Sequence, residues 1–167
     1  MVVAASGASW AMPALAVQAA PDPAAAFLST NRTASGVVET ASGLQYKVLT
    51  PGQGDAKPTD QDIALVNYEG RLIDGTSFDK STQPTPMPVA GVVPGFAEGL
   101  KLMARGAKYR FWIKPELGYG SEGSGPIPAN SVLVFDVEML DFLPEAVVRQ
   151  MMEQQQSQAA PTAAPQP

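Results

Sequence analysis

Short, mainly apolar segments, some alternating strictly with polar residues, recur through the middle of the chain and are typical of β-strands. They are residues 44–49, 63–70, 108–113 and 132–142. Asp74-Gly75 follows the second segment and predicts a tight turn into another short strand. Residues 82–88 contain three prolines, which donate no ladder hydrogen bond, so this stretch is not expected to form a central strand.

One helix is predicted among these strands, over residues 94–103. Phe96, Leu100 and Met103 recur at helical spacing and form an apolar stripe. Pro94 suits the first turn of a helix, and Gly106 follows its end. One helix among five to six antiparallel strands indicates the α+β class.

The segment before the strands falls into two parts. Residues 1–20 are small and apolar, and Ala14-x-Ala16 and Val17-x-Ala19 are typical of signal-peptidase sites, so a signal peptide is predicted. The alternative is a disordered Ala-rich leader, because no Lys or Arg precedes the apolar run. Residues 21–41 are expected to form an arm that starts with a short helix, capped by Asp22 with Pro23 as its first residue.

The segment after the strands, residues 144–167, is rich in Gln, Met, Ala and Pro. Its first part is expected to be a helix that ends near Gln158. Its last part is expected to be a disordered tail of low complexity.

The composition excludes several kinds of chemistry. The 167 residues have a formal net charge of -5 and no basic stripe, which argues against a nucleic-acid partner. The chain has no histidine and no cysteine, which excludes serine–histidine chemistry, thiol nucleophiles and most zinc sites. No metal or other cofactor is therefore expected. The apolar leader is too short to span a membrane stably.

Aromatic residues gather in a few short motifs that contain few charged groups. These are Val66-Asn67-Tyr68-Glu69-Gly70, Gly75-Thr76-Ser77-Phe78-Asp79-Lys80-Ser81, Val92-Val93-Pro94-Gly95-Phe96, Gly118-Tyr119-Gly120, Ile127-Pro128 and Leu133-Val134-Phe135-Asp136-Val137. Taken singly, Phe78 and Phe135 are as well explained as core residues, Tyr68 as a packing residue and Asp79 as a turn residue. Their joint order favours an aromatic pocket, which suits proline better than a sugar, a phosphate or a metal.

From about Ser42 to Asp141 the chain resembles the FKBP-type, macrolide-binding peptidyl-prolyl cis-trans isomerases, and most of all their bacterial exported branch. The motifs that carry the resemblance occur in the family's order and near its spacing. They are Gly43-Leu44-Gln45-Tyr46-Lys47-Val48-Leu49, Asp74-Gly75-x-x-Phe78-Asp79-x-Ser81, Val93-Pro94-Gly95, Glu116-Leu117-Gly118-Tyr119-Gly120 and Ile127-Pro128-Ala129-Asn130.

The resemblance implies a twisted antiparallel sheet wrapped around one short helix, with the isomerase domain over residues 42–143 and the pocket between sheet and helix. It implies catalytic roles for Tyr68, Asp79 and Tyr119. It implies substrate-binding roles for Phe78, Val92, Val93, Phe96, Ile127 and Phe135. The pocket floor, commonly tryptophan in the family, is Phe96 here. Met87 is expected to fill part of a wall where the family usually places phenylalanine.

The expected activity is rotation about X-Pro bonds of unfolded or Pro-containing polypeptides, in the service of folding exported proteins. Macrolide inhibitors are further expected ligands. The protein is expected to be periplasmic or otherwise exported, or cytoplasmic if the leader is not a functional signal. A monomer is expected: exported relatives that dimerise carry a long helical N-terminal domain, whereas here only residues 21–41 lie between the predicted signal peptide and the predicted isomerase domain.

Three other functions stay open at this point. A chaperone module that holds Pro-containing segments without catalysis is favoured slightly by Phe96 and Met87. A glycosidase that uses Asp74 and Asp79 is disfavoured, because the two carboxylates flank one tight turn. The C-terminal segment could be a scaffold that binds a partner through Met151-Met152.

Overall fold

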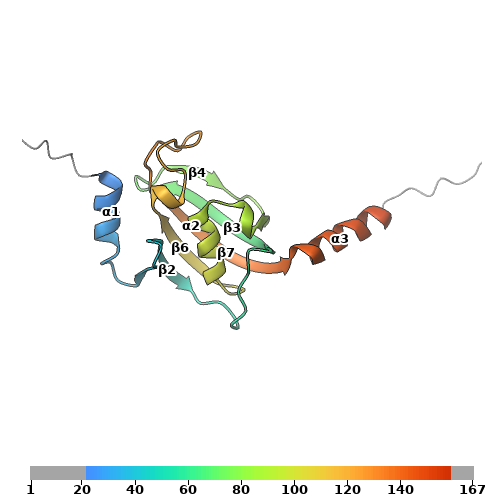
Figure 1. Ribbon diagram of the computed structural model, residues 1–167. Coiled ribbons are helices and arrows are strands. Elements are labelled where there is room, and N and C mark those ends of the chain that lie inside the picture. The colour runs from blue at the N-terminus through green and yellow to red at the C-terminus, as the bar shows by residue number, and fades with distance from the viewer. Residues whose placement is uncertain (1–21, 159–167) are drawn as a thin grey trace, which may run out of the picture.

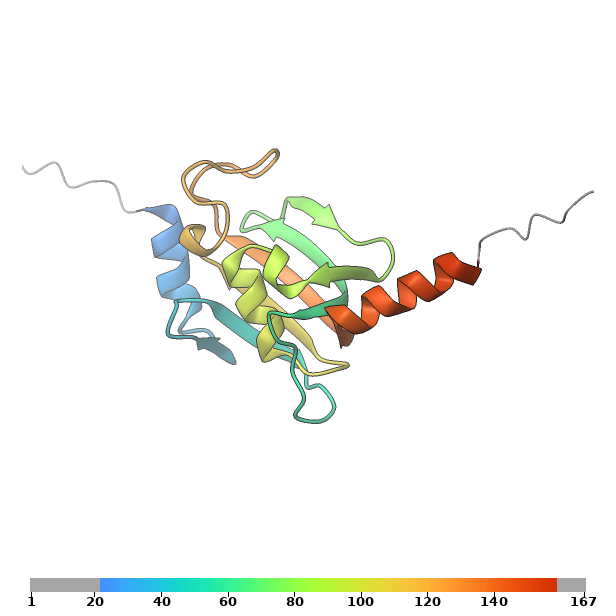
Figure 2. The ribbon, with the colours of Figure 1, turned by 45° about the vertical axis from the view of Figure 1, so that its right-hand side comes forward.

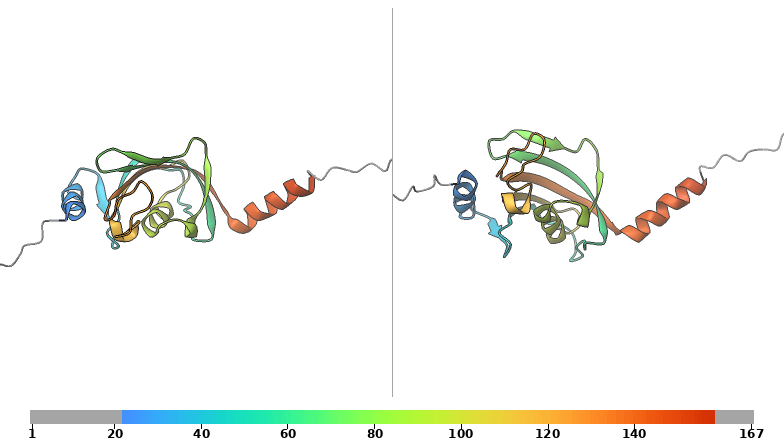
Figure 3. Two further views of the ribbon diagram at one scale, coloured as in Figure 1. Left: turned by 90° about the horizontal axis from the view of Figure 1, so that it is seen from above. Right: turned by 45° about the horizontal axis from the view of Figure 1, so that its top comes forward.

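A seven-stranded antiparallel sheet curls around helix α2 in the part of the chain that the computed structural model describes, residues 22–158 (Figures 1 and 3). Its strands are β1 (Val37–Glu39), β2 (Gln45–Thr50), β3 (Asp62–Leu72), β4 (Ser77–Lys80), β5 (Thr85–Pro88), β6 (Lys108–Ile113) and β7 (Leu133–Pro144). The path across the sheet is β1-β2-β6-β7-β3-β4, and β5 pairs with the first half of β3. The expected α+β class, with a sheet wrapped around one short helix, is confirmed.

The sheet has seven strands rather than five to six because two short segments pair at its edges. β1 lies in the predicted arm and pairs with β2 over three residues. β5 contains Pro86 and Pro88, which alternate with Thr85 and Met87, so the N–H groups of the latter pair remain available for β3. Its place beside β3 agrees with the expectation that this stretch is not a central strand.

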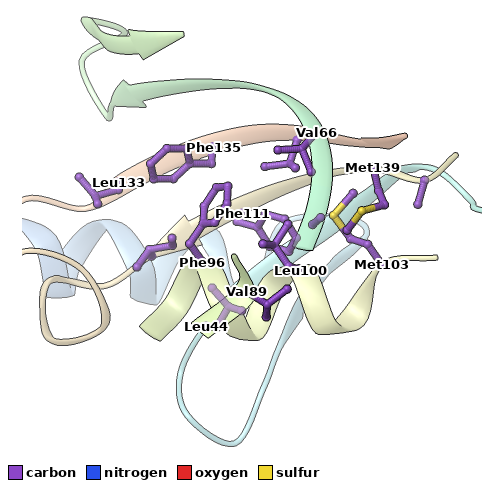
Figure 4. Close-up of a cluster of buried hydrophobic side chains, with 14 of the residues drawn as sticks. Leu44, Val66, Val89, Phe96, Leu100, Met103, Phe111, Leu133, Phe135 and Met139 are labelled. Atoms are coloured by element: carbon purple, nitrogen blue, oxygen red, sulfur yellow. The ribbon is translucent and has the colours of Figure 1, made fainter. Parts of the chain in front are cut away.

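Helix α2 (Pro94–Leu102) fills the concave side of the sheet, called the inner face below. Phe96 and Leu100 of the helix, and Met103 directly after its end, are all buried and point into the core, as the apolar stripe predicts (Figure 4). A β-carbon at Gly99 would lie 2.8 Å from the Phe111 ring, so glycine is what lets the helix approach β6 this closely.

The alternation of side chains in β7 defines the opposite side of the sheet, the outer face. Leu133, Phe135 and Val137 are buried against the inner core, whereas Val134 and Asp136 between them are half-buried on the outer face. Neighbouring residues therefore serve different surfaces, as the period of two in a strand requires.

The N-terminal arm packs on the outer face. Helix α1 (Pro23–Asn31) starts with Pro23, and the Asp22 carboxylate accepts the Ala24 N–H at 3.0 Å, so the predicted cap is confirmed. Ala24 forms a small apolar cluster with Trp112 and Val132. The buried Gln45 amide fastens the arm by hydrogen bonds to the Leu28 carbonyl, Asn31 and Glu39.

Helix α3 (Glu145–Gln158) continues directly from β7 and projects away from the sheet (Figures 1 and 2). It ends where the sequence predicts, and none of its residues is buried. Across residues 22–158, no helix combines the length and apolar character needed to cross a membrane. The predicted signal peptide and the predicted tail beyond Gln158 lie outside the described residues.

Candidate active site

A pocket of about 340 Å³ opens on the inner face, between the start of α2 and strands β3, β4 and β7. Its lining residues come from six separate segments of the chain. They are Tyr68, Asp79, Met87, Gly91, Val92, Val93, Phe96, Tyr119 and Phe135. Asp79 is the one side chain of this lining that carries a charge, so the pocket is an apolar cavity with a single carboxylate at its edge.

Tyr68 and Asp79 face each other across β3 and β4. The Tyr68 hydroxyl donates a hydrogen bond to Oδ2 of Asp79 at 2.8 Å, and the other carboxylate oxygen accepts the Lys80 N–H at 2.9 Å. Burial, and then the hydrogen bond from Tyr68 to the Asp79 carboxylate, raise the pKa of Tyr68 to about 12. The hydroxyl therefore stays protonated near neutral pH and keeps its orientation toward Asp79.

Three aromatic rings form the floor and the back wall of the pocket. Phe96 and Phe135 meet edge to face, with ring centroids 4.9 Å apart, and their side chains point toward each other from α2 and β7 (Figure 4). The Tyr68 ring lies 6.3 Å from Phe96 and 6.4 Å from Phe135. Such edge-to-face and tilted contacts are favourable between aromatic rings, so the three rings form well-packed apolar surfaces of the cavity.

Two of the predicted pocket residues, Phe78 and Ile127, are not among the lining residues. Phe78 packs edge to face on Phe135 at 5.5 Å, and Ile127 is buried in the core cluster. Gly70 makes room for this packing, because a β-carbon there would lie 2.6 Å from the Phe78 ring and 2.8 Å from that of Phe135. The geometry brings together the other seven predicted residues in the lining.

Val93 and Tyr119 place polar groups at the pocket. The Val93 carbonyl accepts the Phe96 and Ala97 N–H groups that begin α2, and within residues 22–158 no protein group accepts the Val93 N–H. Tyr119 is 40% exposed in the loop after η2 (Pro115–Leu117), where its carbonyl accepts the Gly123 N–H. Both a backbone donor and a hydroxyl are thus available to a ligand.

The lining also contains two residues that are not among the predicted catalytic and substrate-binding residues, Met87 and Gly91. Met87 fills the wall that the sequence led us to expect it to fill. Gly91, the last residue of η1 (Val89–Gly91), was missed, and the signal that marks it is its position directly before Val92-Val93-Pro94. A β-carbon at Gly91 would lie 3.4 Å from the Pro88 side chain, which is an ordinary contact distance.

The outer face carries a second hollow of about 340 Å³ with a different character. Its lining carries side chains of both charge signs. They are Glu69, Lys80, Lys108, Arg110, Asp136 and Glu138. Asp136 binds both Arg71 and Arg110, the latter at 2.6 Å. Within residues 22–158, no group of three or more acidic side chains is placed to hold a metal ion.

Comparison with known proteins gives matches to two family models, which cover different residues of the chain. The family model of the FKBP-type peptidyl-prolyl cis-trans isomerases matches residues 54–140. The family model of the domain amino terminal to FKBP-type peptidyl-prolyl isomerases matches residues 11–48.

Two relatives carry the name FKBP-type peptidyl-prolyl cis-trans isomerase FkpA. The protein from Aeromonas hydrophila is 49% identical over 117 residues, which are 68% of this chain and 43% of that protein. The protein from Escherichia coli K12 is 48% identical over 112 residues, which are 65% of this chain and 41% of that protein. The chain thus spans less than half the length of these relatives.

Two solved structures resemble the fold. The crystal structure of FkpA from Escherichia coli has a TM-score of 0.69 at 43% identity, over 72% of this chain and 58% of that chain. A peptidyl-prolyl cis-trans isomerase from Pseudomonas syringae pv. tomato also has a TM-score of 0.69, at 38% identity over 71% of this chain and 90% of that chain.

Proposed function

This chain belongs to the FKBP-type peptidyl-prolyl cis-trans isomerase family, and from that membership we propose that it catalyses rotation about X-Pro peptide bonds. The observation that carries the proposal is the apolar aromatic cavity whose single carboxylate, Asp79, is held by the Tyr68 hydroxyl. Residues 42–143 are the proposed isomerase domain, and the family match over residues 54–140 supports these limits.

The chemistry asks little of the protein beyond selective binding. Rotation about a peptide bond faces a barrier of about 18–20 kcal/mol, because the C–N bond has partial double-bond character. For X-Pro the cis and trans forms differ by only about 0.5–1 kcal/mol, yet they exchange over tens to hundreds of seconds. The twisted amide carries less charge separation than the planar one, so an apolar cavity favours the transition state over both planar forms.

The lining supports a division of roles in this reaction. Phe96, Phe135 and Val92 hold the proline ring in the cavity. The Val93 N–H and the Tyr119 hydroxyl bind substrate carbonyls. Phe78, which packs on Phe135, and Ile127 complete the proposed substrate-binding set.

Asp79 and Tyr68 act together at the rim of the cavity. The hydrogen bond between them orients the carboxylate toward the bound amide, where its charge polarises the amide as it twists. Neither residue needs to form a covalent bond or to transfer a proton, which agrees with a chain that has no histidine and no cysteine.

The test is the catalysed cis–trans exchange of a short X-Pro peptide, measured for the natural protein, Asp79→Ala and Phe96→Trp. We expect the natural protein to accelerate exchange, Asp79→Ala to lose about tenfold or more, and Phe96→Trp to keep or raise the rate. Absence of exchange by every folded variant would contradict the isomerase. Prevention of aggregation by those same variants would then favour the chaperone module, which the Phe96 floor and the Met87 wall also suit.

Three further properties are part of the proposal. Pro-containing polypeptides are the partners, and macrolides compete with them for the aromatic cavity, which an exchange assay with added macrolide tests. The protein is a monomer, which light scattering tests. It is exported through the predicted signal peptide, and sequencing the N-terminus of the mature protein after expression in bacteria tests this step.

A further inference from the structure

Strands β4 and β5 are two parts of one segment that runs along β3. β4 pairs with Glu69, Gly70 and Arg71, while β5 pairs with residues 63–66. Between the two strands the chain arches away from the sheet, visible as the green loop in Figure 2. The pocket takes Asp79 from β4 and Met87 from β5, so its rim includes both sides of this break.

Ser81 lies where the chain leaves β3, and it makes three hydrogen bonds to the main chain of Tyr68. The Ser81 N–H donates to the Tyr68 carbonyl at 2.9 Å, as a regular rung would. The Ser81 hydroxyl accepts the Tyr68 N–H at 2.9 Å and donates to the Tyr68 carbonyl at 3.2 Å. The hydroxyl thus takes the place of a strand carbonyl, which allows the chain to turn away while the Tyr68 N–H keeps a partner.

This arrangement joins the two polar residues of the pocket. Tyr68 and Asp79 stand on different strands, and Ser81 follows Asp79 by two residues, at the end of β4. On the other side of Asp79, the pairing of β3 and β4 shifts register between Gly70 and Arg71. The contacts of Ser81 therefore fix the end of β4 that lies closest to Tyr68.

We infer that Ser81 is a positioning residue: its hydroxyl sets the separation between the Tyr68 hydroxyl and the Asp79 carboxylate. As far as catalysis is concerned, the inference rests on the proposed isomerase function. Ser81 itself acts through Tyr68 and Asp79 rather than on a substrate.

A merely structural serine would contribute stability without affecting this pair, and Ser77 offers a matched comparison. It also lies on β4, and its hydroxyl donates to the Gly70 carbonyl of β3 at 3.4 Å. Ser77 precedes the register shift, so its loss leaves the rung between Ser81 and Tyr68 in place.

The experiment follows the ionisation of Tyr68 by NMR in protein labelled with ¹³C at the tyrosine rings, with Tyr68→Phe to identify the signal. The groups that face the Tyr68 hydroxyl are Asp79 and Tyr119, and the expected pKa of Tyr68 in the natural protein is about 12. In Ser81→Ala we expect the midpoint to move toward the ordinary value by at least about half a pH unit, because the carboxylate is released. Ser77→Ala and Ser81→Thr are both expected to keep the midpoint of the natural protein.

The same variants are then compared in the exchange assay. We expect kcat/KM of Ser81→Ala to fall about tenfold, mainly through kcat, because the apolar walls that bind proline are unchanged. Ser77→Ala and Ser81→Thr are expected to stay within about twofold of the natural protein, the first because its serine lies beyond the pair and the second because it keeps a hydroxyl.

The inference is overturned if Ser81→Ala keeps both the midpoint and the kcat/KM of Ser77→Ala. If Ser81→Ala does not fold, Ser81→Cys takes its place, because a thiol is a weak hydrogen-bonding group and predicts the same direction of change. If the natural protein has no isomerase activity, the proposed function fails, while the Tyr68 titration still decides the role of Ser81.

Discussion

The two faces of the sheet each hold an aspartate, and the partners of the two differ. Asp136 on the outer face is bound by Arg71 and Arg110, and its side chain is only 16% exposed. Asp79 on the inner face is bound by a neutral hydroxyl and a backbone N–H. The residue type is the same but the partners differ: Asp136 joins strands β3, β6 and β7, whereas Asp79 lies at the pocket, where we propose that it acts on a bound amide.

The largest expected effect is a loss of stability on the inner face, at a residue that belongs to both the pocket and the core. Phe135→Ala is expected to lower the free energy of unfolding by about 3–5 kcal/mol, because the ring is buried between Phe78, Phe96 and Tyr68. Its neighbour on the outer face, Val134, is the matched control, and Val134→Ala is expected to cost about 1 kcal/mol. Urea unfolding measures both. Equal losses would contradict the assignment of the core to the inner face.

A pair of aspartate substitutions tests the comparison directly. Asp136→Asn is expected to lower the free energy of unfolding by about 1–3 kcal/mol, because Arg71 and Arg110 lose their shared counter-charge. It should leave the exchange rate of an X-Pro peptide within about twofold, since Asp136 faces away from the pocket.

Asp79→Asn is expected to show the reverse pattern. The exchange rate should fall about tenfold or more, while the free energy of unfolding changes by less than about 1 kcal/mol. Both quantities are measured for both variants. If both variants lost mainly stability, or both lost mainly exchange rate, the two carboxylates would not differ in role.

The smallest effect is a dependence of stability on alkaline pH. The pKa of Tyr68 is raised in the folded protein, so the unfolded chain releases this proton first as the pH rises. The contribution of Tyr68 is therefore complete below its ordinary pKa of 10.0 and is lost as the pH rises through about 12. Unfolding by urea between these values should show a steeper loss in the natural protein than in Tyr68→Phe. Tyr119→Phe, which keeps the Tyr68–Asp79 pair, should retain the steeper loss.

The sequence was sufficient to predict the elements whose patterns are strong over their whole length. The bounds of β6 were predicted without error, and α2 ends within one residue of its predicted end. The Asp74-Gly75 turn predicted that β4 folds back on β3, whereas the roles of Tyr68 and Asp79 came from the family resemblance. These features depend on local pattern and turn chemistry.

The rest depends on contacts between distant parts of the chain. β1 and β5 are too short to be recognised by periodicity, and they become strands only because β2 and β3 offer free edges. Phe78 and Ile127 are apolar, like most of the lining, and yet they are not part of it. Whether such side chains line the cavity depends on packing, such as that of Phe78 and Phe135 around Gly70, which no local pattern contains.

Trp112 lies beneath the N-terminal arm with only 8% of its surface exposed. The chain has two tryptophans, and the other, Trp10, belongs to the predicted signal peptide. A form cleaved after residue 20, as proposed above, contains a single indole, located between α1 and the outer face rather than in the pocket. Its fluorescence will therefore report detachment of the arm from the sheet, and occupation of the pocket will have to be followed by another optical signal.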